Sequence, residues 1–311
     1  MRALIHDPDA PRGLRLADDV PAPEPAPDEA LVRVAAVSLN FGELDLVGGN
    51  PPGQVVGRDS AGTVLRAAAD GSGPPAGTRV ASFAPGGGAW AQLQAVPGRD
   101  LAVLPDGVEP GAVAALPSAG VSALRAVRRL GAVLGRRVLV TGASGGVGRY
   151  AVQLAALAGA DVVASVGAPE RGRGLRELGA AQVVVGLDGV DEPVHGVLDN
   201  VGGPLLADAL DLVAEHGVVQ QIGAASGEPT VLNLAHKLVN RRLELFVVGT
   251  GLTTGDARFA FGPDLAYLAR LLGEGRLDAQ IGWRGPWERA VEGADALFGR
   301  RVAGKVVLDV T

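Results

Sequence analysis

The sequence predicts an α/β protein with one β-rich domain and one domain built on a doubly wound parallel sheet. Three observations support this fold class. The chain has 311 residues, which is long enough for two domains. Its N-terminal third contains short apolar segments separated by glycine and proline. Beyond residue 110, strand-like and helix-like segments alternate, which is typical of a parallel sheet covered by helices.

The N-terminal third predicts a barrel-like domain. Residues 30–37 form the best strand candidate, and residues 62–65 and 79–83 are two more. Prolines alternate with other residues from Pro21 to Pro27, so this segment should be extended and cannot be a central strand.

The remainder of the chain predicts repeated strand–helix units. An apolar segment from Val113 to Leu130 predicts one or two helices. Strands are expected at residues 138–140, 162–166, 183–185, 196–199, 217–222 and 243–248, with helices over 148–157, up to Leu178-Gly179, and over 263–272. We expect a final strand at residues 304–310 to return to the first domain.

The composition excludes several classes of protein. Hydrophobic residues make up 47% of the chain and charged residues 20%, which excludes a disordered chain, and the 47 glycines follow no period. The net charge of −6 and the lack of a basic stripe argue against a nucleic-acid partner. Neither a signal peptide nor an uncharged apolar segment of about 18 residues is found, so we expect a cytoplasmic protein with no membrane partner.

The absence of cysteine restricts the chemistry further. A chain without cysteine has no disulfides, no thiolate nucleophile and no cysteine-ligated metal. The histidines are scattered and do not combine with carboxylates at ligand spacing: they are His6, His195, His216 and His236. We therefore expect no metal site.

A glycine-rich loop between a strand and a helix gives the sharpest functional signal. The loop residues that we expect to bind a cofactor are Ala143, Ser144, Gly145, Gly146, Val147 and Gly148. Gly145 and Gly148 allow the backbone to approach a pyrophosphate at the helix N-terminus. The usual pattern has a glycine at position 143, so the glycines alone are weak evidence. The strand before and the helix after them predict a Rossmann-type dinucleotide site.

The end of the next strand favours NADP(H) over NAD(H). No acidic residue follows strand 162–166 directly to bond a ribose 2′-hydroxyl. Arg171 and Arg173 lie close beyond it, and guanidinium groups pair well with a 2′-phosphate. We expect Arg171 to contribute more. The alternative is that both arginines are solvated, with Glu170 as their partner.

Eight short segments occur in an order that is typical of one known family. They are Ser38–Glu43, Val56–Gly62, Gly86–Ala91, Ala115–Ala123, the glycine-rich loop with its helix, Asp199–Gly203, Ile222–Gly227 and Gly304–Leu308. They are spread along nearly the whole chain. In these segments the chain resembles the zinc-free quinone oxidoreductase (zeta-crystallin-like) branch of the medium-chain dehydrogenase/reductase superfamily. The resemblance implies a GroES-like β-barrel-type catalytic domain over residues 1–116 and 256–311, and a Rossmann domain over residues 117–255.

The resemblance also implies site residues. Asn40 would be a catalytic residue near the nicotinamide and the substrate, with Glu43 where the family commonly has Asp. Ser122 would face the nicotinamide in place of the usual Thr. Further cofactor-binding residues would be Asn200, Gly202, Gly223 and Lys305. The alternatives are that Asn40 only ends a strand and that Ser122 is an ordinary helix residue.

The residues of zinc-dependent relatives are missing. Those proteins carry a catalytic Cys and a Gly-His-Glu segment, where this chain has Gly57-Arg58-Asp59 and no cysteine. Without a Lewis acid, alcohol oxidation is disfavoured, and NADPH-dependent reduction of a quinone or an enone fits better. The family often has a Tyr after its Asn motif, where this chain has residues 48–52 without one. We therefore expect the proton to come from solvent.

Two other functions stay open. A freestanding enoyl-thioester reductase of polyketide or fatty-acid assembly would use the same cofactor, and a non-catalytic NADPH-binding protein would use the site without turnover. The resemblance also implies a homodimer, paired through an edge strand at residues 244–248.

Overall fold

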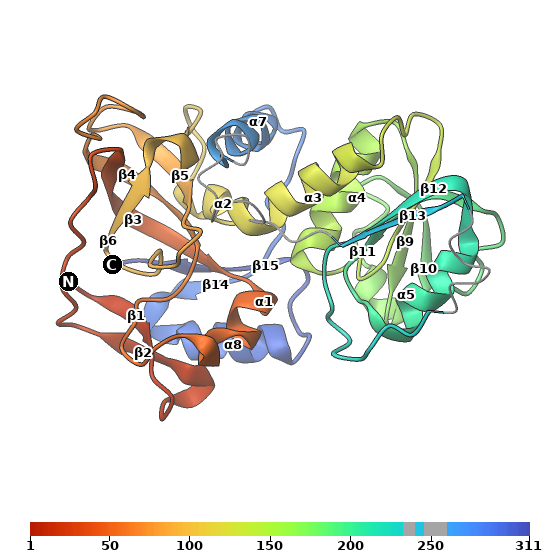
Figure 1. The fold of residues 1–311 in the computed structure, drawn as a ribbon, viewed down its shortest axis with the longest axis horizontal. Coiled ribbons are helices and arrows are strands. Elements are labelled where there is room, and N and C mark those ends of the chain that lie inside the picture. The colour runs from red at the N-terminus through yellow and green to blue at the C-terminus, as the bar shows by residue number, and fades with distance from the viewer. Residues whose placement is uncertain (233–239, 246–259) are drawn as a thin grey trace. The chain divides into compact units, whose positions relative to one another are not determined.

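Two sheets of different character dominate the fold (Figure 1). The computed structural model describes residues 1–232, 240–245 and 260–311. The chain divides into two compact units, Met1–Val121 with Gly249–Thr311, and Ser122–Val248. The domain boundary expected at residues 255–256 lies outside the described residues.

The first unit is built on a seven-stranded sheet of described residues that is mostly antiparallel. Its strands run in the order β14 (Ile281–Pro286), β15 (Lys305–Asp309), β3 (Glu29–Leu39), β4 (Asp59–Arg66), β5 (Arg79–Phe83) and β7 (Leu101–Val103), with β6 (Leu93–Pro97) also paired to β3. β1 (Ala3–His6) and β2 (Leu14–Ala17) form a separate hairpin. Because β15 pairs antiparallel with β3, the last strand does return to the first unit, as predicted.

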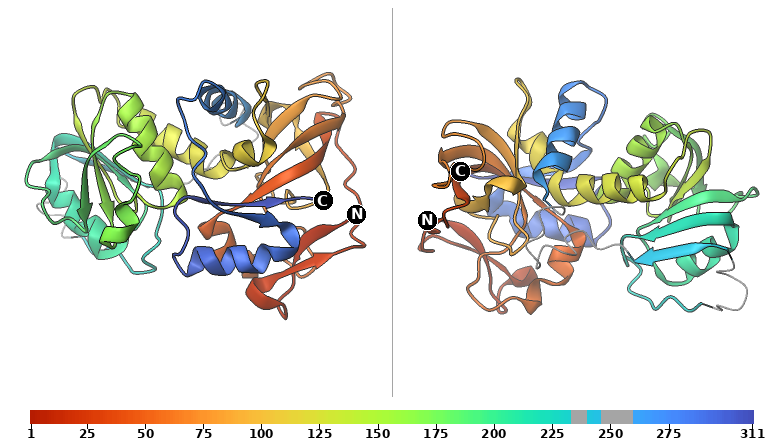
Figure 2. Two further views of the ribbon diagram at one scale, coloured as in Figure 1. Left: turned by 180° about the vertical axis from the view of Figure 1, so that it is seen from behind. Right: turned by 45° about the horizontal axis from the view of Figure 1, so that its top comes forward.

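The core of this unit lies between β3, β15 and α8 (Ala290–Phe298). Every second residue from Ala30 to Ala36 is buried along β3, which is the alternation of a strand with one face in a core. Trp90 and Trp287 are buried in one cluster with Val34, Val37 and Leu39 of this strand. The views in Figure 2 show α8 beside β14 and β15, the two strands that it contacts.

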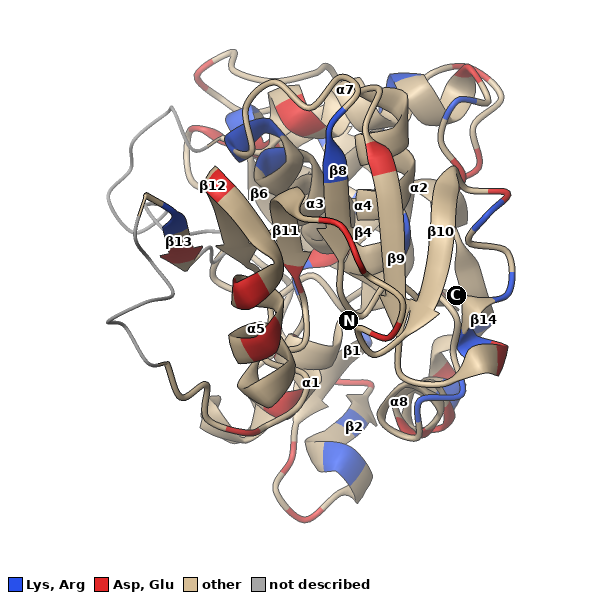
Figure 3. Ribbon diagram, turned by 90° about the vertical axis from the view of Figure 1, so that its right-hand side faces the viewer, with Lys and Arg blue, Asp and Glu red and all other residues tan. Residues whose placement is uncertain are grey.

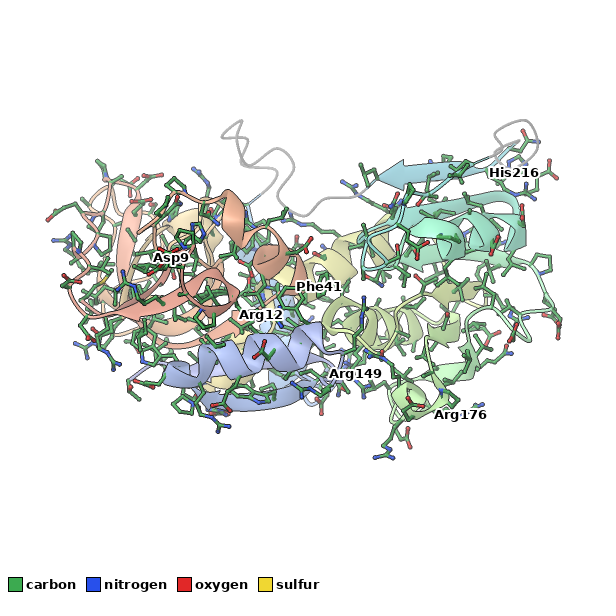
Figure 4. All side chains as sticks on the ribbon, turned by 90° about the horizontal axis from the view of Figure 1, so that it is seen from below. Asp9, Arg12, Phe41, Arg149, Arg176 and His216 are labelled. Carbon is green, nitrogen blue, oxygen red and sulfur yellow. The ribbon has the colours of Figure 1, made fainter. Side chains whose placement is uncertain are left out.

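Three further α-helices lie in the described part of the first unit. They are α1 (Phe41–Asp45), α2 (Pro110–Ala114) and α7 (Gly262–Gly273). α1 is held against α8, because the rings of Phe41 and Phe298 lie 5.1 Å apart. Arg12 also reaches α8, where its Nε lies 2.6 Å from Asp295 Oδ1 (Figure 4). The ring contact holds α1, a helix of only five residues, next to the end of β3.

The second unit contains a parallel sheet with six strands among the described residues. Their order is β10 (Ala180–Val185), β9 (Asp161–Val166), β8 (Arg137–Val140), β11 (Val194–Asp199), β12 (Val213–Gln221) and β13 (Arg242–Leu245), and every pairing is parallel. From β8 the chain moves outward to β9 and β10, and from β11 it moves the other way. The doubly wound sheet predicted from the sequence is therefore confirmed.

Right-handed crossovers then put the helices on both faces of this sheet. α4 (Gly146–Leu157) connects β8 to β9, and α5 (Gly203–Ala209) connects β11 to β12 in the opposite direction. Two crossovers of the same hand that run in opposite directions along a sheet place their helices on opposite faces. Figure 3 shows this for α4 and α5. α3 (Pro117–Arg129) precedes β8. The order in which the chain adds strands reverses between β8 and β11. Sheets of this kind bind ligands at such a reversal point.

One predicted helix is not observed. The connection from β9 to β10 contains a short 3-10 helix, η4 (Pro169–Gly172), and turns up to Gly179. Gly174 and Gly179 have φ angles of 78° and 105°, in the left-handed region where a right-handed helix cannot continue. The prediction of a helix ending at Leu178-Gly179 is therefore wrong. The strand expected at residues 243–248 is described only as far as Leu245.

Candidate active site

The glycine-rich loop lies between β8 and α4 in the second unit. Gly142 has a φ of 59°, so it makes the tight turn that leaves the strand. Gly145 is the N-cap of α4, and no side chain caps this end of the 12-residue helix. The free N–H groups and the dipole of such an N-terminus attract an anion.

Gly148 keeps α4 close to the loop. A Cβ at this position would lie 2.3 Å from the carbonyl oxygen of Gly142 and 2.7 Å from the Cα of Ala143. Both atoms belong to the backbone, so no side-chain rotation could make room. Only glycine permits this approach, and the helix N-terminus is thereby held against the turn.

The end of β11 is joined to this loop by hydrogen bonds. Thr141 Oγ1 donates to Asp199 Oδ1 at 2.6 Å, and the Asn200 side-chain amide donates to the Thr141 carbonyl at 2.9 Å. Asp199 also accepts from the Gly202 N–H at 2.9 Å through Oδ2. Burial raises the pKa of Asp199, and these hydrogen bonds oppose the shift.

The predicted residues Asn200, Gly202 and Gly223 therefore meet at one edge of the sheet. The Gly223 N–H donates to the Asp199 carbonyl at 3.2 Å, and a Cβ at Gly223 would lie 2.8 Å from the Asn200 carbonyl oxygen. Thr141 and Gly142 contribute to this edge, although the sequence analysis did not single them out. The signal for both was their position between the predicted strand and the loop.

Arg171 lies against the glycine-rich loop. It is half-buried on η4, and its Nε donates to Ser144 Oγ at 2.9 Å. Arg173 is exposed, and its carbonyl accepts from Arg149, which is labelled in Figure 4, at 3.3 Å. The structure thus brings Arg171 and Ser144 together, whereas no such contact links Arg173 to the loop among the described residues.

These features fit a dinucleotide. The cradle at Gly148, the helix N-terminus without a side-chain cap and the guanidinium beside Ser144 would suit a molecule with several phosphates. Ser122, the other residue predicted to contact the cofactor in this unit, is buried on α3.

A second group of polar side chains lies in the first unit, which we call the Asp59 cluster: the buried Asp59 and Lys305 and the half-buried Asn40 and Glu43. Asp59 starts β4 and is 0% exposed. Its carboxylate accepts from Ser38 Oγ at 3.0 Å, from the Ser118 N–H at 3.0 Å and from the Ser118 hydroxyl.

Asn40 is hydrogen-bonded to the three other members of this cluster. It precedes α1 but does not cap it. Its Nδ2 donates to Glu43 Oε2 at 2.6 Å and to Asp59 Oδ2 at 2.8 Å. Its Oδ1 accepts from Lys305 Nζ, which lies 3.7 Å from Asp59 Oδ2 and donates to the Leu39 carbonyl at 3.2 Å. The amide is therefore oriented from both ends.

The structure brings Lys305 to Asn40 and Glu43, the two predicted catalytic residues. Its side chain is only 2% exposed, at the start of β15. The resemblance had implied a cofactor-binding role for Lys305, and the described contacts of its ammonium group are to Asn40, Asp59 and the Leu39 carbonyl. Asp59 was noted only as part of a family segment, and nothing local in the sequence signalled that it would be buried.

Burial controls the charges in the Asp59 cluster. It raises the pKa of Glu43 to about 8, with help from the negative charge of Asp59. Asn40, Arg58 and Lys305 oppose this shift, because they favour the carboxylate. Burial also lowers the pKa of Lys305, while Asp59 and Glu43 support its charge. Glu43 is half-buried, and its Oε1 is shielded from solvent without a hydrogen-bond partner in the described structure.

The described residues lack a metal-binding cluster and a membrane-spanning helix. No group of three or more His, Cys, Asp or Glu residues among them could hold a metal ion. None of the helices within residues 1–232, 240–245 and 260–311 has the length and apolarity needed to cross a bilayer.

Comparisons with known proteins match both units. The alcohol dehydrogenase GroES-like domain family matches residues 26–106, and the zinc-binding dehydrogenase family matches residues 146–260. The quinone oxidoreductase of Pseudomonas aeruginosa is 30% identical over 321 residues, covering 96% of each chain. The acryloyl-coenzyme A reductase of Sulfurisphaera tokodaii is 26% identical over 344 residues, covering 99% of each. A mycobacterial protein solved with NADPH has a TM-score of 0.86 at 25% identity, with coverage of 99% of this chain and 100% of that one.

Proposed function

The chain belongs to the quinone oxidoreductase branch of the medium-chain dehydrogenase/reductase superfamily, and on this premise we propose that it is an NADPH-dependent reductase of quinones or enones. That it is an oxidoreductase follows from the family. The observation that carries the finer proposal is the glycine-rich loop with Arg171 beside it.

NADPH, when bound, would supply the hydride. We propose that its pyrophosphate binds at the N-terminus of α4, where Gly148 keeps the helix close to the turn. Arg171 would bind the 2′-phosphate, with Arg173 in support, because a guanidinium can bond two phosphate oxygens at once. Arg171 already lies at this loop, and the similarity to a mycobacterial protein solved with NADPH supports the same cofactor.

The class of hydride acceptor that we propose depends on which catalytic residues the chain contains and which it lacks. One matched family is described as zinc-binding, but this chain contains no cysteine and has Arg58 where zinc-dependent relatives have His. We therefore propose a reaction without zinc, in which hydride adds to a conjugated acceptor that delocalises the resulting negative charge. Asn40 and Glu43 are proposed to face that acceptor, and the protein to contribute orientation and proximity.

A second candidate is reduction of an enoyl thioester. Its support is the similarity to an acryloyl-coenzyme A reductase along 99% of both chains. Hydride addition to the β-carbon would be the same step, since a thioester carbonyl also delocalises the charge.

Turnover assays distinguish these proposals. We expect NADPH to be oxidised in the presence of 9,10-phenanthrenequinone. If NADPH is oxidised with crotonyl-coenzyme A but not with quinones or enones, the protein is a thioester reductase. NADPH binding without turnover of any acceptor would refute both and leave a non-catalytic NADPH-binding protein.

We also propose that the protein forms a homodimer through β13. Among the described strands it is the last in its sheet, and Leu245 at its end is 72% exposed. Figure 3 shows basic and acidic residues on β13 at the sheet edge. Of these, Glu244 is bonded within its own sheet by Gln220 Nε2 at 2.8 Å. A second copy that paired here would cover the exposed edge.

A further inference from the structure

Reduction of a quinone or an enone needs a proton as well as a hydride. A tyrosine hydroxyl can donate such a proton, and the chain has two tyrosines, Tyr150 and Tyr267. Tyr150 is completely buried on α4, and Tyr267 lies on α7, with its ring 5.2 Å from the Arg270 guanidinium. The Asp59 cluster contains the carboxyl group of Glu43, one oxygen of which has no hydrogen-bond partner in the described structure.

From this arrangement we infer that Glu43 is the catalytic proton donor, with Asn40 as the positioning residue that keeps the transferable proton on Oε1. The inference rests on the proposed function. It differs from the sequence-based expectation, in which solvent supplies the proton directly.

The hydrogen bonds of Asn40 determine which oxygen of Glu43 carries the proton. Lys305 Nζ can only donate, so the Asn40 atom that it contacts must be the carbonyl Oδ1. The other end of the amide is then the NH₂ group, which donates to Asp59 Oδ2 at 2.8 Å and to Glu43 Oε2 at 2.6 Å. Glu43 Oε2 already accepts, and Nδ2 cannot accept in return. A proton on Oε2 would weaken that hydrogen bond, so we place the proton of Glu43 on Oε1, which accepts none.

Oε1 is the atom without a hydrogen-bond partner in the described structure. A buried polar atom that is left unsatisfied costs free energy, and a carboxylate oxygen costs more than a neutral one. The O–H group of a protonated Glu43 therefore has no bond within the described structure to give up, and an acceptor oxygen can bond to it once the acceptor displaces the atoms that shield Oε1. Its position is stable, because Phe41 and Phe298 hold α1 against α8.

The surrounding charges allow Glu43 to be either a neutral acid or a carboxylate. The charged groups that act on it are Asp59, Arg58 and Lys305. Asp59 and burial favour the neutral acid, and its pKa of about 8 leaves Glu43 mostly protonated at neutral pH. Lys305 and Arg58 stabilise the carboxylate that forms when the proton leaves. A donor works best when its pKa lies near the working pH.

The proposed step is balanced. Hydride addition leaves two electrons and a negative charge on the acceptor. The O–H bond of Glu43 breaks, a new bond forms to the acceptor oxygen of a quinone or the α-carbon of an enone, and the electron pair stays on the carboxylate. Water then returns a proton to Glu43. No further oxidant or reductant is needed.

The first test compares Glu43→Gln with Asp45→Asn. Asp45 is exposed on the same helix and is outside the Asp59 cluster. We expect Glu43→Gln, which keeps the shape but cannot donate in this way, to lower kcat about 100-fold or more, because general acids contribute roughly 10²–10⁴-fold. The KM for NADPH should not change, and Asp45→Asn should behave as wild type. Glu43→Asp should recover part of the lost kcat.

The second test measures the proton without turnover. In the apo protein labelled with ¹³C-glutamate, one carboxyl signal should titrate near pH 8 and be absent from Glu43→Gln. Asn40→Asp adds a negative charge and an acceptor beside Oε2, so this signal should titrate at higher pH while kcat falls. The inference is overturned if Glu43→Gln retains wild-type kcat, or if no carboxyl titrates near pH 8. A wild type that reduces no acceptor would instead overturn the proposed function.

Discussion

Replacing Gly148 by alanine tests the proposed cofactor cradle most directly. The added methyl group would lie 2.3 Å from the Gly142 carbonyl oxygen, more than 1 Å inside the ordinary contact distance of 3.4 Å. The obstacles are backbone atoms, so α4 itself must move. Overpacking of this kind costs about 1–3 kcal/mol, and the better helix propensity of alanine offsets at most about 1 kcal/mol.

Because this position lies in the first turn of α4, where helix propensity counts least, the expected net loss is about 1–3 kcal/mol. For a unit of this size, we expect the Tm to fall by about 2–12 °C. NADPH should bind more weakly as well, because the N-terminus of α4 is displaced from the turn. Thermal unfolding and calorimetric titration with NADPH measure the two effects.

The matched control is Gly167→Ala at the end of β9. A Cβ there meets nothing within 4 Å, and the residue does not have a positive φ. We expect this variant to keep the wild-type Tm or to gain slightly, because alanine lowers the entropy of the unfolded chain. If Gly148→Ala matched this control in Tm and kept the wild-type affinity for NADPH, the close-packing argument would be refuted.

The remaining predictions concern the cofactor, zinc, assembly and pH. Arg171→Ala should remove charge-assisted hydrogen bonds worth about 1.5–3 kcal/mol and weaken NADPH binding about 10- to 100-fold while NADH affinity stays constant; equal losses for both would mean that Arg171 only supports the fold. Chelation should leave activity unchanged, and metal analysis showing one zinc per chain with activity lost on its removal would contradict this. Sedimentation at micromolar concentration should show a dimer that Leu245→Asp dissociates, whereas a wild-type monomer would exclude pairing through β13. Because the folded-state pKa of Glu43 is raised to about 8, its contribution to stability is complete below the usual carboxyl pKa and declines as the pH rises through 8. Urea unfolding from pH 5 to 9 should show this decline in wild type and less of it in Glu43→Gln.

Local patterns in the sequence were sufficient for much of the fold. The alternation along residues 30–37 identified a strand because burial on one face of a sheet has a period of two. The glycine-rich loop was recognisable because its strand, turn and helix are contiguous. The expected helix before Gly179 is wrong for a local reason that composition does not convey: the backbone at Gly174 adopts a left-handed conformation.

The Asp59 cluster depended on tertiary structure. Lys305 and Asn40 are 265 positions apart, and they meet only because β15 pairs with β3. The protonation of Glu43 depends on burial and on the distance to Asp59, and neither is encoded in the residues next to it. The sequence by itself therefore determined the elements and the loop chemistry, where interactions are between near neighbours. The charge state and orientation of the candidate proton donor were decided by desolvation and by contacts between distant segments, which exist only in the folded chain.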